Sequence, residues 1–378
     1  MNELAELSML ETPAVLLDLA KLESNLEAMQ RLADEHSVEL RPHAKTHKSI
    51  EVARRQMALG ASGLTVATVG EALVFLNSAI KSITISRPMV SPGSFARLFA
   101  DPAALAADLR IVVDSKYGVQ VAAERAASAN VTLGVLVKID VGLHRCGVDP
   151  VSAVPVELAR QIVAASHLNF RGILSHAGQV YATEVRQAAV EIAEAERKTM
   201  LEVRDVLVEQ GIAVPEVSVG STPTVLAAAS FTGITEIRPG NYAFLDLLPI
   251  RVGVVTHEDV ALSVLATIIS KNADFFITDA GSKTLTSDTG GHGMASAQGF
   301  GVAYPCEHYL DPNYSMAVAG LSEEHGKLTR TNFDLRVGAK VRIIPNHSCP
   351  VANLAREYVV LNKGQLGSWS VDAASNAG

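Results

Sequence analysis

Short apolar runs that alternate with long helical stretches constrain the fold of this chain most strongly. The runs are rich in Val, Ile and Leu, and the stretches between them are rich in Ala, Glu, Gln and Arg. This alternation is typical of strand and helix units that build a buried parallel sheet. After an opening strand at 14–18, eight runs follow at residues 39–45, 63–67, 82–88, 110–114, 132–140, 171–176, 216–222 and 236–242.

Eight such units favour a (β/α)8 TIM-type barrel, with an open doubly wound sheet as the alternative. The predicted helices include residues 22–34, 49–59, 70–78 and 184–210. From about residue 255 the pattern changes to short strands separated by Gly, Asn and Asp turns, which indicates an antiparallel β domain. We therefore expect a barrel at 1–254 and a β domain at 255–378, and the opening strand could join either part.

Composition and charge exclude several classes of protein. Of the 378 residues, 48% are hydrophobic and 19% are charged, as in folded chains, and a net charge of -8 argues against nucleic acid as a partner. No apolar run reaches the roughly 18 residues of a membrane span, and Glu3 and Glu6 lie where a signal peptide would be positive. The 3 cysteines fit a reducing compartment. We expect a cytoplasmic protein without a membrane partner.

The first of the eight runs carries basic residues where a barrel strand is normally apolar. In an extended chain Arg41, His43 and Lys45 share one face, because side chains alternate with a period of two. Three basic groups on the inside of a barrel repel one another unless an anion lies among them. Lys45 ends the run, at the rim where such barrels carry catalytic groups. An exposed edge or a solvated loop is the alternative interpretation.

A turn of small residues ends the seventh run, at Gly220, Ser221 and Thr222. Backbone N–H groups and hydroxyls at such a turn can hold a phosphate. Alone the pattern is weak, because Ser-Thr-Pro is also an ordinary helix start. Gly240 and Asn241 close the next run at the same rim.

Other strand ends also carry polar side chains. His176 ends the sixth run and is followed by Tyr181, and Arg145 follows the fifth run. A lone histidine in such a place is more often structural than catalytic. These residues add to the polar character of the rim without fixing a reaction.

The C-terminal part contains His347 and Cys349, two residues apart. In an extended chain both side chains point to the same side, so an imidazole and a thiolate can bind one metal ion, and Zn2+ suits that pair best. The spacing alone is only suggestive. Two protein ligands would leave positions open for substrate, as in catalytic metal sites.

Taken together, these segments resemble the fold type III pyridoxal-phosphate enzymes of the D-threonine aldolase and D-serine dehydratase family, nearly along the whole chain and in order. The motifs are RPHAKTHKS, KIDVGLHRCG, SHAG, VSVGSTPT, RPGNYAF, DAGSK, EEHG and PNHSC. The resemblance implies an alanine-racemase-like barrel with a C-terminal β domain, a homodimer with both subunits near each active site, pyridoxal 5'-phosphate (PLP) and a divalent metal. Zn2+ is the first choice of metal, with Mn2+ or Co2+ as alternatives.

The resemblance also implies roles for individual residues. Lys45 matches the lysine that binds PLP covalently and, when released, takes the Cα proton. The implied catalytic residues are Lys45, Tyr181 and His176; the implied cofactor-binding residues are Lys45, His43, Arg145, Tyr181, Gly220, Ser221, Thr222, Gly240 and Asn241. His347 and Cys349 match the metal ligands.

Two positions favour dehydration over aldol cleavage. The family's aldolases tend to carry an aspartate where this chain has Cys349, and a histidine near the position of Tyr181. The resemblance therefore implies a lyase that converts D-serine or D-threo-3-hydroxyaspartate to a 2-keto acid and ammonia, with D-threonine or D-3-hydroxyaspartate aldolase as the alternative. A racemase, with Tyr309 or Tyr314 as second base, and a non-catalytic PLP-binding protein are further alternatives. The β domain argues against the last.

Overall fold

Eight parallel strands form the first of two sheets. The computed structural model describes residues 3–290 and 299–374, and the strands of this sheet pair in the order β2, β9, β8, β7, β6, β5, β4 and β3. They are β2 (Glu39–Leu40), β3 (Leu64–Val66), β4 (Ser82–Ile85), β5 (Asp108–Val113), β6 (Leu133–Lys138), β7 (Leu168–Leu174), β8 (Glu216–Val219) and β9 (Glu236–Ile237). A parallel bridge between His43 and Thr65 links the chain after β2 to β3, so the two edges meet. The predicted barrel is confirmed.

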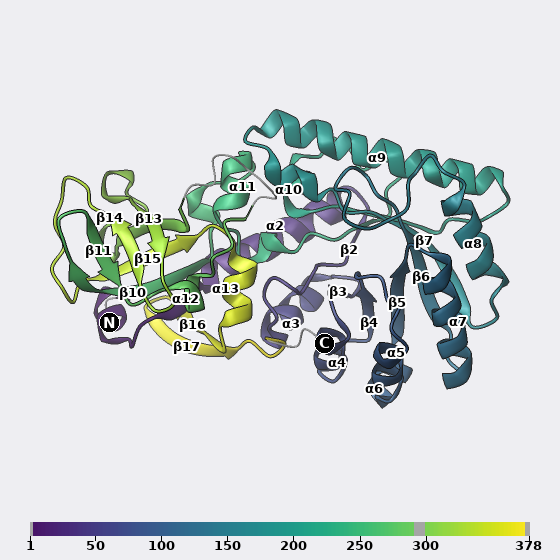
Figure 1. Cartoon of the computed structure of the whole chain (residues 1–378), viewed down its shortest axis with the longest axis horizontal. Coiled ribbons are helices and arrows are strands. Elements are labelled where there is room, and N and C mark those ends of the chain that lie inside the picture. Colours follow the sequence, from purple (N-terminus) through teal and green to yellow (C-terminus); the bar gives the residue numbers. More distant parts are fainter. Residues whose placement is uncertain (1–2, 291–298, 375–378) are drawn as a thin grey trace.

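Helices surround this sheet (Figure 1). They are α2 (Leu19–Glu35), α3 (Ile50–Leu59), α4 (Val69–Leu76), α5 (Pro92–Phe99), α6 (Pro102–Leu105), α7 (Lys116–Ala129), α8 (Val154–Ala164), α9 (Arg186–Glu209) and α10 (Thr222–Ala227). Capping residues and apolar faces in the local sequence help determine where these helices begin and how they pack. In α2, for example, the Asp18 carboxylate caps the helix by accepting from the Lys21 N–H, and Leu22, Leu26 and Met29 on one face enter the core. No helix in the described ranges is long and apolar enough to cross a membrane.

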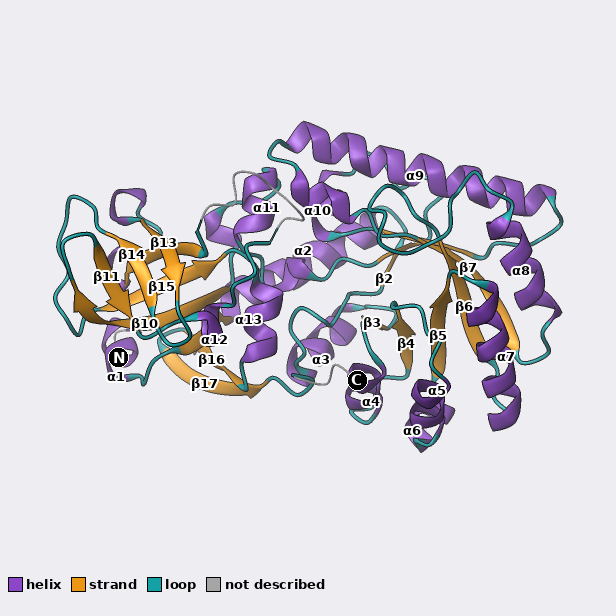
Figure 2. Ribbon diagram, viewed as in Figure 1, coloured by secondary structure: helices purple, strands orange, loops and turns teal. Residues whose placement is uncertain are grey.

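The second sheet forms the β domain at the other end of the molecule (Figure 2). Its order is β11, β14, β13, β12, β15, β10, β1, β16 and β17, and an added β11–β10 pairing closes the first six of these strands into a ring. The strands are β1 (Ala14–Asp18), β10 (Leu262–Lys271), β11 (Phe275–Thr278), β12 (Gly301–Pro305), β13 (Met316–Leu321), β14 (Gly326–Thr329), β15 (Lys340–Pro345), β16 (Glu357–Asn362) and β17 (Gln365–Ser370). The opening strand β1 pairs with β10 and β16 and therefore lies in this sheet.

Short helices complete the described part of the chain. The α-helices are α1 (Glu3–Met9), α11 (Leu247–Val252), α12 (Ser282–Leu285) and α13 (Ser348–Leu354), and the 3-10 helices are Gly178–Ala182, Asn241–Ala243, His257–Asp259, Cys306–His308 and Pro312–Tyr314. Two of the 3-10 helices, at 178–182 and 241–243, follow barrel strands and bring Tyr181 and Asn241 to the rim.

The prediction that Arg41 shares a bound anion with His43 and Lys45 is wrong, because Arg41 does not line their cavity. The strand ends at Leu40, and Arg41 Nε lies 2.6 Å from a carboxylate oxygen of Glu236, with both side chains almost fully buried. Arg41 is therefore neutralised inside the barrel and needs no external anion. The predicted strand was too long at its end: the Arg41 and His43 N–H groups still donate to Ile237 O and Pro239 O, but residues 44–47 form a turn.

Candidate active site

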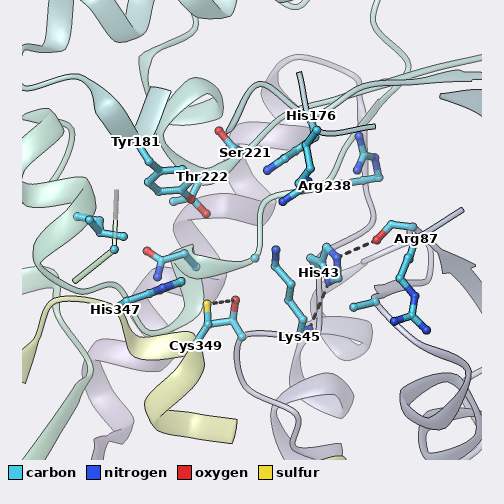
Figure 3. Close-up of a pocket in the computed structure, with 18 of the residues that line it drawn as sticks. His43, Lys45, Arg87, His176, Tyr181, Ser221, Thr222, Arg238, His347 and Cys349 are labelled. Carbon is cyan, nitrogen blue, oxygen red and sulfur yellow. Dashed lines mark hydrogen bonds between the residues drawn. The ribbon is translucent and has the colours of Figure 1, made fainter. Parts of the chain in front are cut away.

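A cavity of about 790 Å³ lies where the barrel rim meets the β domain (Figure 3). Every predicted site residue except Gly220 lines it: His43, Lys45, Arg145, His176, Tyr181, Ser221, Thr222, Gly240, Asn241, His347 and Cys349. Gly220 lies behind the wall, where its carbonyl oxygen is 3.4 Å from His176 Nδ1. Its φ of 107° favours glycine at this strand end. The structure thus brings together residues from six separate segments of the sequence.

Lys45 lies on a turn, and its side chain extends into the cavity (Figure 3). Burial lowers the pKa of its amine, because the attraction of Cys349 and Glu71 for the charged form does not offset desolvation. The nearby guanidinium groups of Arg145 and Arg238 lower the pKa further. The side chain is therefore prepared to act as a neutral amine, the form that attacks a carbonyl or accepts a proton.

A chain of hydrogen bonds fixes the His43 ring beside the backbone of Lys45. Ser86 Oγ donates to Val66 O at 3.0 Å, so it accepts from His43 Nε2 at 3.0 Å, and His43 Nδ1 accepts from the Lys45 N–H at 3.3 Å. This pattern requires the neutral ring with its proton on Nε2. Burial, followed by repulsion from Lys45, holds the pKa of His43 well below its usual range, in agreement with that form.

The opposite wall carries His176 and Arg238. Burial and repulsion from Lys45 hold the pKa of His176 well below its usual range, so its imidazole faces the cavity uncharged. Arg238 Nε donates to Ser218 Oγ at 2.7 Å, and its Nη2 donates to the Ser175 carbonyl oxygen. Arg238 is therefore held by the ends of β7 and β8, and His176 by the Gly220 carbonyl oxygen.

Tyr181, Ser221 and Thr222 form the upper wall of the cavity (Figure 3). Burial, followed by repulsion from Cys349, raises the pKa of Tyr181 well above its usual range, so its phenol keeps its proton. A capping box between Ser221 and Thr224 opens α10, and Thr222 Oγ1 accepts from the Tyr242 N–H at 3.0 Å.

His347 and Cys349 occupy the start of α13 and face the lysine from the β domain. His347 Nδ1 lies 3.0 Å from Asp288 Oδ2, which turns Nε2 away from that carboxylate. Burial opposes the charged imidazole, but Cys349 and Asp288 raise the pKa of His347 to about 11. For Cys349, burial favours the neutral thiol, but His347 and Lys45 lower its pKa overall. Each side chain therefore favours the charged form of the other.

This donor pair fits a divalent metal ion. Imidazole and thiolate are the ligands that Zn2+ prefers, and a carboxylate on the far ring nitrogen is the usual support of a metal-bound histidine. Within residues 3–290 and 299–374, no group of three His, Cys, Asp or Glu side chains is placed to hold a metal. The pair would therefore leave coordination positions open, as a catalytic metal requires.

The cavity also fits PLP. Its lining includes Lys45, Arg87, Lys138, Arg145 and Arg238, whereas Asp288 is its one carboxylate among the residues that the structure describes. Such a positive cavity would be balanced by a phosphate and a carboxylate. The hydroxyls of Ser221 and Thr222 lie across the cavity from the Lys45 amine, where they can meet the phosphate end of a cofactor attached to that lysine.

Comparison with known proteins agrees with this geometry. Residues 17–247 match the model described as "Alanine racemase, N-terminal domain", and residues 261–361 match the "Putative serine dehydratase domain". The chain belongs to the alanine racemase N-terminal domain family.

Two relatives show the range of reactions found in this family. The D-threo-3-hydroxyaspartate dehydratase of Delftia sp. strain HT23 is 37% identical over 331 residues, 85% of this chain and 84% of the relative. The D-threonine aldolase of an Arthrobacter species is 37% identical over 288 residues, 75% of each chain. Identity alone therefore does not separate dehydration from aldol cleavage.

Solved structures confirm the alanine-racemase-like fold. The Delftia sp. HT23 D-threo-3-hydroxyaspartate dehydratase superposes with a TM-score of 0.89, at 34% identity over 96% of this chain and 98% of the other. A cysteine-to-alanine variant of a D-threo-3-hydroxyaspartate dehydratase, in its metal-free form, gives a TM-score of 0.90 at the same identity and coverage.

Tyr309 and Tyr314, the two tyrosines considered above as the second base of a racemase, lie outside the cavity. The Tyr309 ring lies under the Arg342 guanidinium at 3.7 Å, and Tyr314 stacks on His308 with ring centroids 3.7 Å apart. Within the described chain, both serve packing in the β domain.

Several lining residues were not selected from the sequence as site residues. They are Thr46, Ser86, Arg87, Lys138, Cys146, Arg238 and Asp288. Lys138 is the charged last residue of the otherwise apolar strand β6, a signal that could have found it, and Arg238 directly follows β9. Asp288 lies 59 residues from its partner His347, with no local motif to connect them.

Proposed function

We propose that this chain is a PLP- and divalent-metal-dependent lyase that converts a D-3-hydroxy amino acid, D-serine or D-threo-3-hydroxyaspartate, to a 2-keto acid and ammonia. One observation carries the proposal: Lys45 from the barrel and the His347 and Cys349 pair from the β domain line the same cavity. When bound, PLP supplies an electron sink for the bond broken at Cα, and the metal supplies a Lewis acid for the β-hydroxyl.

Lys45 has the properties of the base for the Cα proton. Its amine is buried and its pKa is lowered, which favours the neutral form that can accept a proton. Its fixed turn limits it to one side of a bound substrate, which supports selection of one enantiomer. We assign the D enantiomer from the family resemblance.

His347 and Cys349 would hold the metal. The Asp288 carboxylate orients the His347 ring through Nδ1, so Nε2 and the Cys349 sulfur remain as donors on the cavity side. Zn2+ suits this pair best, and Mn2+ or Co2+ are alternatives. The dehydratase relative solved in a metal-free form supports a metal-dependent reaction.

The remaining lining residues would bind and orient. Ser221, Thr222, Gly240 and Asn241 are assigned to the phosphate end of the cofactor. The protonated Tyr181 phenol can donate to an anionic ligand or to the leaving oxygen. Lys138 and Arg145 are the cationic groups assigned to a substrate carboxylate. The uncharged rings of His43 and His176 would exclude water from the cavity.

Aldol cleavage is the second candidate, because the Arthrobacter D-threonine aldolase is as similar in sequence as the dehydratase. The same residues serve both reactions: dehydration breaks the Cα–H bond, whereas aldol cleavage breaks the Cα–Cβ bond. Cys349, where the resemblance places an aspartate in the aldolases, favours dehydration.

Product analysis tests this proposal. The protein is loaded with PLP and Zn2+ and incubated separately with D-serine, D-threonine and the hydroxyaspartate diastereomers. Keto acid and ammonia in equal amounts support the dehydratase. Glycine with an aldehyde would establish the aldolase instead, and absence of both product pairs would overturn the proposal.

Assembly and location remain predictions. We propose a homodimer with each active site near the subunit interface. Light scattering after size exclusion measures the mass of the assembly and therefore the number of subunits. The cytoplasmic location expected from the cysteine content is also a prediction.

A further inference from the structure

The barrel holds the beginning of the turn that carries Lys45 through backbone hydrogen bonds. The Lys48 N–H donates to Ala44 O at 2.8 Å and closes the turn, and the Ala44 N–H donates to Thr65 O at 2.8 Å. These bonds fix the residues that precede Lys45. After Lys45, backbone groups of His47, Lys48 and Ile50 make hydrogen bonds to a different part of the molecule.

Tyr358 on β16 binds the end of the turn. Its Oη donates to His47 O at 2.6 Å, and the side chain is fully buried. The ring packs edge-on against Phe244, with centroids 5.3 Å apart. Burial also keeps the phenol protonated by raising its pKa, so it is a permanent donor to this carbonyl. A rigid strand of the β domain therefore fixes the backbone two residues after Lys45.

The segment after β17 makes the next two contacts, where it passes α3 (Figure 1). The Ala373 N–H donates to Lys48 O at 2.9 Å, and Asp372 Oδ2 accepts from the Ile50 N–H at 2.7 Å. Ser49, the N-cap residue of α3, makes no side-chain cap of its own. Asp372 thus supplies from a distant part of the chain the anionic cap that the local sequence lacks.

Lys48 shows that this arrangement is imposed by the surroundings. Its φ of 51° lies in the left-handed region that non-glycine residues rarely adopt. Its Nζ is held 2.8 Å from Glu71 Oε1, and its carbonyl by Ala373. Such a backbone conformation persists only when several contacts determine it together.

We propose that Tyr358 and Asp372 are positioning residues for Lys45: through His47 O and the Ile50 N–H they set where the lysine amine lies relative to the His347 and Cys349 pair. The inference rests on the proposed function only in taking Lys45 as the cofactor lysine. The β domain would then have two roles: it carries His347 and Cys349, and it aligns Lys45 with them.

The test compares Tyr358→Phe, Asp372→Ala and Asp372→Asn with the native holoenzyme. Tyr304→Phe is the matched control, because Tyr304 is another buried tyrosine of the β domain and its ring packs against Tyr309 in a separate cluster. For Tyr358→Phe and Asp372→Ala we expect kcat to fall about tenfold with KM nearly unchanged, since a small misplacement of a reacting group is costly. The pH midpoint of the cofactor absorbance at Lys45 should also shift, because the amine moves relative to Cys349 and Arg145. Asp372→Asn keeps an oxygen acceptor for the Ile50 N–H and should remain near native.

The outcomes separate this inference from the proposed function. If borohydride does not attach the cofactor to Lys45 in the native protein, the proposed function fails. If Lys45 is labelled but the folded Tyr358→Phe and Asp372→Ala proteins keep native kcat and a native pH midpoint, this inference alone is overturned. Asp372 is exposed, so its alanine variant is expected to fold and provides a test even if Tyr358→Phe is unstable.

Discussion

The sulfur of Cys349 lies 3.3 Å from Oγ1 of Thr46, the residue that follows Lys45. This contact joins the start of α13 in the β domain to the lysine turn of the barrel. Because the metal pair and the lysine are neighbours across one cavity, a single small substrate can reach both. The predictions below follow from that proximity and from the packing that maintains it.

Lys45 is expected to carry the cofactor. Purified protein with PLP should absorb in the visible range, and borohydride followed by peptide mass analysis should find the label on Lys45. Lys45→Ala should lose both the label and lyase activity. Lys48→Arg is the control, because the Lys48 amine is already paired with Glu71. Labelling of Lys48 in the native protein would refute the assignment.

Cys349→Ala should lose the metal while keeping the fold and the cofactor, because Lys45 anchors PLP independently. Metal content by atomic absorption should fall from about one ion per chain to a small fraction of that. Cys306→Ala provides the comparison: burial raises the pKa of Cys306 to about 12, and it lies outside the cavity, so its loss should leave the metal in place. Equal metal content in both variants would rule out the proposed ligand.

The stability of the protein should depend on His47 below neutral pH. Burial lowers the pKa of His47 to about 4, despite hydrogen bonds with Gln56 and Ser49, from 6.5 in the unfolded chain. The unfolded state therefore binds a proton more readily, and stability falls as the pH drops from 6.5 toward 4. Between pH 7.5 and pH 5 this group costs about 2 kcal/mol.

Urea unfolding at both pH values measures this effect. His47→Gln should lose less stability on acidification than the native protein, by about 2 kcal/mol. The comparison between the two proteins cancels the contribution of other titrating groups. An identical pH dependence in both would show that His47 does not titrate as described.

Removal of Glu236 should destabilise the barrel strongly, because it would leave Arg41 buried without its carboxylate partner. Glu236→Ala is expected to lower the free energy of unfolding by about 3–5 kcal/mol. Glu157→Ala breaks the exposed pair with Lys116 and should cost at most about 1 kcal/mol. Similar losses in the two variants would contradict the buried ion pair.

The strand order of the barrel could be predicted because buried parallel strands are recognisable as apolar runs. Strand lengths could not, because Lys45 continues the alternating pattern of Arg41 and His43 although the chain already turns at residues 44–47. Lys45, His347 and Cys349 could be selected from their unusual composition and spacing. Their mutual position could not, because it depends on how the two domains pack.

Contacts between residues that are far apart in the chain could also not be predicted from the sequence. Glu236 neutralises Arg41 and Asp288 orients His347, although neither pair is close in the chain. In the sequence, an Asp or Glu that caps a helix or pairs with a buried basic group looks the same as one on the surface. Only the fold shows which acid meets which base.

The most direct test of the central claim is ammonia release from D-serine or D-threo-3-hydroxyaspartate, measured on one sample before chelation, after chelation and after addition of Zn2+. The absorbance of the Lys45-bound cofactor is followed throughout. We predict that chelation abolishes ammonia and keto acid formation without loss of the cofactor absorbance, and that Zn2+ restores turnover. Undiminished ammonia release from the metal-free protein would contradict the account, because the lysine would then act without the metal pair that faces it.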